Sequence, residues 1–206
     1  MVAQFSVNCA ARVSAATVVN QTETKSNIVS SEREALILVD AADHVVGYRD
    51  KSGCHDGDGV LHRAFSLFIF NSAGQLLIQQ RASGKRLWPD FWSNSCCSHP
   101  RRDESMDFAV QRRLEQELGM HCELNYAYKF EYSAKFRDLG TEHELCSVFI
   151  GHTTDEPVIN TTEIRDWRWI DATELSQVLI DRADTFTPWL TLEWQRLKQD
   201  FKALLP

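Results

Sequence analysis

The sequence predicts an α/β domain of the α+β kind, in which a mixed β-sheet is sandwiched between α-helices and an extra N-terminal hairpin precedes the core. Three observations predict this fold class. Apolar or alternating runs of strand length recur along the chain. A helical stripe occupies residues 105–118, and two further helical patterns close the chain. Because strands precede and follow the central helix in the sequence, we expect helices to cover the faces of one sheet.

Length and composition favour one domain. A chain of 206 residues with 43% hydrophobic content can bury one sizeable core. We expect this domain to span residues 32–206, with its core at about 60–195. Residues 1–31 are rich in small and polar residues, with Arg12, Glu23 and Lys25 as their charged members. A disordered tail is expected there, and a weak organelle transit peptide is the alternative.

Charge and cysteine usage indicate the kind of partner and the compartment. With 29 acidic against 22 basic residues, the net charge of -7 argues against a protein that coats nucleic acid or an anionic membrane. No apolar run approaches the roughly 18 residues that a membrane span needs. The six cysteines form no CxxC pair, which favours reduced thiols. We therefore predict a cytoplasmic monomer whose small anionic ligand is held by a local basic cluster.

The first part of the expected domain contains two hairpins separated by a loop. Residues 34–39 and 44–48 are apolar runs around an Asp-containing turn, and residues 64–70 and 75–80 flank a turn that ends in Gly74. The polar, Gly-rich stretch 50–59 is predicted to be a loop. Residues 81–100 show no period, and such a long irregular segment within a compact domain is usually functional.

The clearest helix covers residues 105–118. Met106, Val110, Leu114 and Leu118 recur at every fourth position, and Gly119 follows as a terminator. Further strands and helices are expected after it. The strands lie at about 126–132, 145–150 and 167–170, and the helices at 173–180 and 188–204.

The segment from Ser98 to Met120 resembles the Nudix box, a signature that ends in Arg-Glu-x-x-Glu-Glu-x-Gly on one helix. The residues that fit its frame are Glu104, Arg112, Leu114, Glu115, Gly119 and Met120, with Glu117 between them. The frame is broken where Ser98 replaces a Gly, Arg113 a Glu, and Gln116 one Glu of a metal-binding pair. Nudix hydrolases use this helix to hold divalent metals that activate water. Part of that carboxylate set is missing here.

The residues that depart from the Nudix box form a pattern with residues outside it. The run Cys97-Ser98-His99-Pro100 leads into the degenerate helix, and Glu142-His143-Glu144 follows downstream. This combination is similar to the type I isopentenyl diphosphate isomerases, over roughly residues 34–195. The resemblance implies a Nudix fold and an allylic proton transfer that interconverts isopentenyl and dimethylallyl diphosphate for isoprenoid biosynthesis.

Moving an unactivated double bond requires an acid that protonates carbon and a base on the opposite face. The resemblance assigns these roles to Cys97, in preference to its neighbour Cys96, and to Glu144. It places Tyr132 where it relays or orients the proton of Glu144. It also implies that Trp92 faces the cation that develops in the reaction, because an aromatic face stabilises positive charge.

The resemblance further implies a divalent metal site. Three imidazoles and two carboxylates form a mixed nitrogen and oxygen donor set suited to Mn²⁺, Zn²⁺ or Mg²⁺. If residues 142–144 form a strand, both Glu side chains point to one face and His143 to the other. The expected ligands are His55, His62, His99, Glu142 and Glu144.

The diphosphate group is expected to bind a basic set and a second ion. Arg113 stands where a hydrolase carries Glu, which fits a diphosphate that is held and left intact. Glu117 and the backbone carbonyl of Cys97 would bind a Mg²⁺ that bridges the diphosphate. The basic residues implied by the resemblance are Lys51, Arg81, Lys85 and Arg113.

Two other functions fit parts of the pattern. A Nudix hydrolase of nucleotide diphosphates would use the same box, although Arg113 and Gln116 reduce its carboxylate cluster. A noncatalytic module with a structural Zn²⁺ at three histidines is the other alternative, but it gives no purpose to Cys97, Tyr132 or the basic set. Taken singly, each of the basic residues is also compatible with an ordinary surface charge.

Overall fold

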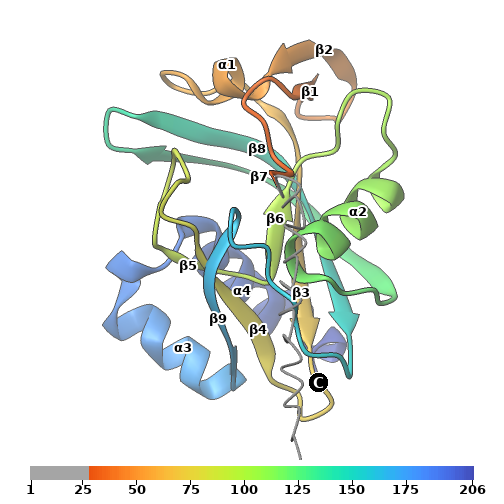
Figure 1. Ribbon diagram of the computed structural model, residues 1–206, viewed down its shortest axis with the longest axis vertical. Coiled ribbons are helices and arrows are strands. Elements are labelled where there is room, and N and C mark those ends of the chain that lie inside the picture. Colours follow the sequence, from red (N-terminus) through yellow and green to blue (C-terminus); the bar gives the residue numbers. More distant parts are fainter. Residues whose placement is uncertain (1–27) are drawn as a thin grey trace, which may run out of the picture.

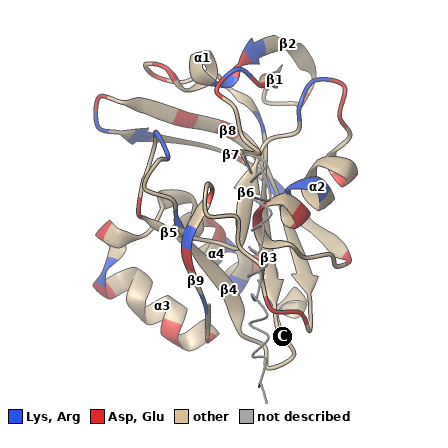
Figure 2. Ribbon diagram, in the orientation of Figure 1, with Lys and Arg blue, Asp and Glu red and all other residues tan. Residues whose placement is uncertain are grey.

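The computed structural model describes residues 28–206 (Figure 1). The tail expected at residues 1–31 lies outside this range except for its last four residues. Within the described range, none of the helices combines the length and the apolar character that a bilayer crossing requires. Basic and acidic residues are interspersed over the helices and strands (Figure 2).

Within residues 28–206, the fold consists of nine strands and four α-helices. The strands are β1 (Ala35–Val39), β2 (Val45–Asp50), β3 (His62–Phe70), β4 (Leu76–Arg81), β5 (Trp92–Ser93), β6 (Cys96–Ser98), β7 (Leu124–Phe136), β8 (Gly140–His152) and β9 (Ile164–Ile170). The helices are α1 (Lys51–His55), α2 (Met106–Leu118), α3 (Ala172–Asp181) and α4 (Pro188–Asp200), with short 3-10 turns at Ala183–Thr185 and Lys202–Leu204.

All strands belong to one mixed sheet with β3 in its middle. β3 runs parallel to β8 and antiparallel to β1, β4 and β6. β7 adds to β8 as a long hairpin, and β9 and β5 add to β4. The predicted mixed sheet is thus confirmed, and so is the first hairpin, formed by β1 and β2.

Helices cover both faces of this sheet (Figure 1). Successive side chains of β3 point to opposite faces, so Phe68 and Phe70 pack with α3 and α4, whereas Phe65, Leu67 and Ile69 pack with α2. All five side chains are buried, as the apolar run predicted. At about 1.5–3 kcal/mol for each buried side chain of this size, β3 contributes a large share of the hydrophobic stabilisation.

α2 forms where the four-residue stripe predicts it. The Ser105 hydroxyl caps its start by accepting a hydrogen bond from the Phe108 backbone amide at 3.3 Å. It ends at Gly119, whose φ of 64° is the left-handed conformation that favours glycine. Val110, Leu114 and Leu118 are buried against the sheet. Arg113 and Glu117 are also buried, beside this stripe, and this places both toward the interior.

Three secondary-structure predictions need correction. The stretch 50–59 is not a loop throughout, because residues 51–55 form α1, capped by the Asp50 carboxylate, which accepts a hydrogen bond from the Gly53 amide. The irregular segment 81–100 contains β5 and β6, which exist only through pairing with β4 and β3. The last helix ends at Asp200, and a separate 3-10 turn follows. Each of these short elements is defined by tertiary contacts that leave no periodic signal.

Gly140 fixes the distance between the β7–β8 hairpin and α1. Its φ is 153°, and a Cβ at this position would lie 2.4 Å from the His55 carbonyl oxygen. Only a glycine lets the two backbones approach so closely. The start of β8 therefore rests directly on the end of α1.

We predict that Gly140→Ala lowers the free energy of unfolding by about 1–3 kcal/mol, because the added methyl group must displace the backbone of His55. Gly84→Ala is the matched control, since a Cβ there meets no atom within 4 Å, and it should change stability by less than about 0.5 kcal/mol. Urea unfolding measures both. Equal effects of the two substitutions would contradict the close approach at Gly140.

Candidate active site

One cavity of about 590 Å³, its mouth included, lies where the ends of several elements converge. Its walls come from α1, the β4–β5 loop, β6, α2, the β7–β8 hairpin and α4. The predicted site residues that line it are Lys51, His55, Arg81, Lys85, Cys97, His99, Arg113, Tyr132, Glu142 and Glu144.

The predicted metal ligands form a cluster on one side of the cavity. One nitrogen or oxygen atom from each residue lies within 4.8 Å of the corresponding atoms of the other four. α1 supplies His55, β3 supplies His62, the segment after β6 supplies His99, and β8 supplies Glu142 and Glu144. All five residues are buried. We call this group the His–Glu cluster.

The imidazoles in the cluster are arranged as metal ligands are. His62 Nδ1 lies 2.7 Å from the Val60 carbonyl oxygen and so carries the proton in the neutral ring, which leaves the Nε2 lone pair facing the cluster. His62 Nε2 is 3.3 Å from His55 Nε2. Burial lowers the pKa of His62 to about 3 and that of His99 well below its ordinary value. The neutral rings of His62 and His99 fit a divalent cation; at His55 burial opposes protonation, but the charge of Glu142 raises the pKa.

The carboxylates complete this donor set. Glu142 Oε2 lies 2.9 Å from His55 Nε2, yet this buried oxygen has no hydrogen bond of good geometry. A buried acceptor without a donor is costly, and a cation at the cluster would satisfy it. Although burial opposes ionisation, His55 lowers the pKa of Glu142 well below its ordinary value. His143 points away and contacts Glu131, which confirms that the two Glu side chains share one face of β8.

Glu144 joins the cluster to the cavity. Its Oε1 atom is 2.9 Å from His99 Nε2, and its Oε2 atom accepts a 2.7 Å hydrogen bond from the Tyr132 hydroxyl. Tyr132 lies opposite Glu144 in the β7–β8 register. Burial and the nearby charge of Glu142 raise the pKa of Glu144 to about 7. This carboxyl can therefore hold or release a proton near neutral pH.

Cys97 lies on β6, and its side chain reaches the same cavity. Its thiol donates a 2.7 Å hydrogen bond to Asn94 Oδ1 and lies 3.5 Å from the Ser66 hydroxyl. Burial raises the pKa of Cys97 to about 12, so the group is a thiol at neutral pH and not a thiolate poised for nucleophilic attack. Cys96 is fully buried against α2, as expected of a packing residue.

The four predicted basic residues line the cavity and contact protein acceptors. Lys51 Nζ donates to Ser30 Oγ at 2.8 Å, and Arg81 donates to the backbone carbonyls of residues 87 and 88 at 3.0 Å. Lys85 forms an ion pair with Glu163. Arg113 donates to Glu117 Oε1 at 2.9 Å from Nε and 2.5 Å from Nη2.

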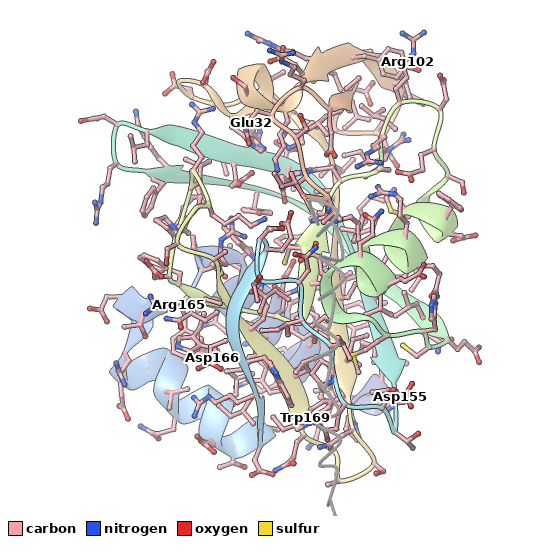
Figure 3. All side chains as sticks on the ribbon, viewed as in Figure 1. Glu32, Arg102, Asp155, Arg165, Asp166 and Trp169 are labelled. Carbon is pink, nitrogen blue, oxygen red and sulfur yellow. The ribbon has the colours of Figure 1, made fainter. Side chains whose placement is uncertain are left out.

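Two further acidic residues belong to this part of the site and have no signal in the sequence. Glu163, just before β9, is buried and lies 3.3 Å from Arg113 in addition to its pair with Lys85. Although burial opposes ionisation, Lys85 and Arg113 lower the pKa of Glu163. Glu32, labelled in Figure 3 beside α1, lines the cavity 4.0 Å from Lys51. Both are recognisable only once the chain is folded.

The tryptophan that lines the cavity is Trp189, at the start of α4. Its ring lies 5.3 Å from the Arg81 guanidinium carbon, and its indole nitrogen donates to Ser93 Oγ at 3.0 Å. Trp92, the residue expected from the sequence, is not among the lining residues. Its ring packs against the core on the α3–α4 side, under the Arg168 guanidinium. From the sequence, Trp189 is recognisable only as one apolar residue of the predicted last helix.

Most of the Nudix-box carboxylates lie away from the cavity. Glu104 forms a bidentate ion pair with Arg112, at 2.5 and 2.8 Å, which ties the loop before α2 to the helix. Glu115 is exposed and contacts His121. Only Glu117 faces inward among the acidic residues of α2, and it pairs with Arg113.

Comparisons with known proteins agree with this geometry. Residues 60–190 match the model of the NUDIX domain, so the chain belongs to the Nudix superfamily. A crystal structure of a Deinococcus radiodurans protein superposes with a TM-score of 0.66 and 22% identity, over 79% of this chain and 98% of that one. At this identity the likeness shows the fold alone.

Two relatives identify the family of this chain within the Nudix superfamily. Isopentenyl-diphosphate Delta-isomerase 1 of Photorhabdus laumondii is 43% identical over 169 residues, which cover 81% of this chain and 96% of the relative. Isopentenyl-diphosphate Delta-isomerase 2 of Aromatoleum aromaticum is 44% identical over 157 residues, 76% of this chain and 82% of the relative. The chain therefore belongs to the isopentenyl-diphosphate Delta-isomerase family.

We predict that His62→Gln weakens Mn²⁺ binding by at least about 10-fold, because it removes one of five converging donors. His121→Gln is the matched control, since His121 is exposed and far from the cluster in the fold. Calorimetric titration of the chelator-treated proteins with Mn²⁺ measures both affinities. Unchanged affinity in His62→Gln would exclude the His–Glu cluster as the metal site.

Proposed function

We propose that this protein interconverts isopentenyl diphosphate and dimethylallyl diphosphate by moving a carbon–carbon double bond, and thereby serves isoprenoid biosynthesis. The observation that carries the proposal is that a thiol and a carboxyl line one cavity, Cys97 from β6 and Glu144 from β8. An alkene can shift its double bond when one group protonates it and another removes a proton from the allylic carbon.

In the proposed reaction, Cys97 and Glu144 exchange protons with the substrate from different sides of the cavity. Which group donates depends on the direction of the reaction. The Tyr132 hydroxyl, 2.7 Å from Glu144 Oε2, orients the carboxyl and its proton. The raised pKa values support this role: the Cys97 thiol holds a transferable proton at neutral pH, whereas Glu144, with a pKa of about 7, can hold a proton or accept one, so the pair supplies an acid and a base.

Two divalent ions belong to the proposal. When bound at the His–Glu cluster, Mn²⁺, Zn²⁺ or Mg²⁺ would fix the orientation of Glu144 and change its basicity. Glu117 and the Cys97 backbone carbonyl would hold a Mg²⁺ that neutralises charge on the diphosphate, since Mg²⁺ prefers oxygen ligands and phosphate. We further propose a monomeric enzyme of the cytoplasm, in keeping with the free thiols of the described cysteines.

The diphosphate itself is proposed to bind Lys51, Arg81, Lys85 and Arg113. These side chains line the cavity mouth and now contact carboxylates and carbonyls, which a diphosphate would replace as acceptors. Holding the diphosphate intact also fits α2, where a single inward carboxylate, Glu117, is neutralised by Arg113. Hydrolysis would need more carboxylates at this helix to hold the metals that activate water.

The carbon skeleton is proposed to pack against Trp189. The indole face stabilises the partly cationic tertiary carbon that forms when the alkene is protonated. Its location on the cavity wall supports this role better than that of Trp92. The substrate thus has its charged end at the basic mouth and its reacting end between the thiol, the carboxyl and the indole.

We predict that the purified protein, incubated with Mg²⁺ and isopentenyl diphosphate in deuterated water, forms dimethylallyl diphosphate labelled at the allylic carbons. Cys97→Ala and Glu144→Gln should each lower turnover by about 100-fold or more, because each removes one proton-transfer group. Cys122→Ala, which removes a thiol outside the cavity, should leave turnover unchanged.

Product analysis by mass spectrometry decides between isomerase and hydrolase. Release of inorganic phosphate or of a nucleoside monophosphate from a nucleotide diphosphate, without labelled isomer, would refute the isomerase proposal. Full turnover by Cys97→Ala would refute the role of the thiol.

We predict that Trp189→Leu lowers kcat by about 10- to 30-fold, equivalent to the loss of up to about 2 kcal/mol of cation–π stabilisation in a desolvated site. The kcat of Trp189→Phe should lie between the kcat of Trp189→Leu and that of the wild type, because phenylalanine keeps an aromatic face. Trp92→Leu is the matched control and should leave kcat within about twofold. A loss of kcat in Trp92→Leu alone would return the cation-facing role to Trp92.

A further inference from the structure

Glu193, on α4, is a buried acid that the reaction described above does not use. It lies one helical turn after Trp189, on the same side of α4. Its side chain has no exposed surface, and Oε2 has no hydrogen-bond partner. Among residues 28–206, no Lys, Arg or His forms an ion pair with it. An ionised carboxylate in this environment would be strongly disfavoured.

A short path of polar side chains connects Glu193 to Cys97. Glu193 Oε1 lies 3.5 Å from Cys146 Sγ, which lies 3.5 Å from Ser66 Oγ, which lies 3.5 Å from Cys97 Sγ. The path is fixed by the sheet, because Ser66 on β3 is the register partner of Cys97 on β6.

The protonation state of Glu193 suits a donor. Burial raises the pKa of Glu193 to about 8, so at neutral pH most molecules carry a neutral carboxylic acid. A neutral carboxyl has one O–H to donate. The polar groups that face this carboxyl from the surrounding elements are Ser66 on β3 and Cys146 on β8. The carboxyl of Glu144 lies farther away and acts as a source of negative charge.

The surroundings of Cys97 determine where a replacement proton comes from. The thiol donates to Asn94 Oδ1 at 2.7 Å, an acceptor that cannot return a proton. Ser66 is a hydroxyl and can both give and receive one. When Cys97 has given its proton to the substrate, the Ser66 hydroxyl is the donor that lies on the path toward a buried acid.

We propose that Glu193 is a positioning residue that supplies a proton to Cys97 through the Cys146 thiol and the Ser66 hydroxyl. The O–H of Ser66 passes its proton to the Cys97 thiolate, the S–H of Cys146 passes its proton to the Ser66 oxygen, and the carboxylic acid of Glu193 passes its own to the Cys146 sulfur. Cys97 gains one proton and Glu193 loses one, so the total charge of the buried group is unchanged. The inference rests on the proposed isomerase function, because it concerns the proton balance of that site.

The proposed reaction removes the proton of Cys97, and this relay replaces it. Each turnover moves a proton between Cys97 on one side of the substrate and Glu144 on the other, so that a thiolate left on β6 is surrounded by buried groups. Moving the negative charge from sulfur to the carboxylate of Glu193 makes this state less costly, because a carboxylate is ordinarily a weaker base than a thiolate. After the product leaves, a proton from water reaches Cys97, and the same path run in reverse returns a proton to Glu193.

The decisive experiment compares Glu193→Gln, Ser66→Ala and the double variant in the isomerase assay with isopentenyl diphosphate and Mg²⁺. We expect each single variant to lower kcat by about 10-fold or more at unchanged KM. The double variant should be no slower than the slower single variant, because both act on one path. Tyr128→Phe is the matched control: it removes a buried 3.2 Å hydrogen bond to the Glu193 backbone carbonyl and leaves the carboxyl intact.

A second measurement does not depend on activity. The infrared difference spectrum between wild type and Glu193→Gln at neutral pH should contain the carbonyl band of a protonated carboxylic acid. Absence of that band overturns the proposal, as does a kcat of Glu193→Gln within twofold of the wild type, or a fall in kcat with Tyr128→Phe equal to that of Glu193→Gln. Wild-type protein that forms no isomer would instead refute the proposed function itself.

Discussion

The parallel pairing of β3 with β8 holds the site together. The two strands stay in register over nine residue pairs, with His62 opposite Glu144 at one end. The same β3 pairs on its other edge with β6, where Ser66 meets Cys97. A slip of one residue would turn every side chain of β8 to the other face. It would bring His143 into the cluster in place of the two Glu residues. The apolar packing on both faces of β3 excludes such a slip and so fixes the chemistry.

Burial then determines the protonation states of the polar groups in the site. The imidazoles of His62 and His99 are neutral, Cys97 is a thiol, and Glu144 titrates near neutral pH. A chain with a net charge of -7 nevertheless lines the cavity with five Lys and Arg side chains. Any attraction for an anionic ligand is thus a local property of α1, the β4–β5 segment and α2. The overall charge does not predict it.

Membership of the isopentenyl-diphosphate Delta-isomerase family explains how a Nudix fold differs here from a hydrolase. Arg113 takes a position where the box has Glu, and its guanidinium pairs with Glu117, the inward-facing carboxylate of α2. The His–Glu cluster is built from α1, β3, β8 and the residue after β6. The side chains that converge as metal ligands would therefore belong mainly to the sheet and its neighbouring segments, and only one inward carboxylate remains on α2.

The sequence by itself determined the elements whose signals are local. α2 with its Gly119 terminator, β3 buried on both faces, and the alternation of Glu142 and Glu144 follow from periodicity and from the conformational preference of glycine. The motif around Cys97 and the three histidines likewise marked most of the residues that line the cavity. Only the tertiary structure decided that Trp189 and not Trp92 reaches the cavity, that Glu163 pairs with Lys85, and that Glu193 lies behind Ser66. Such contacts join segments far apart in the chain, and their geometry depends on how whole elements pack, which no local pattern encodes.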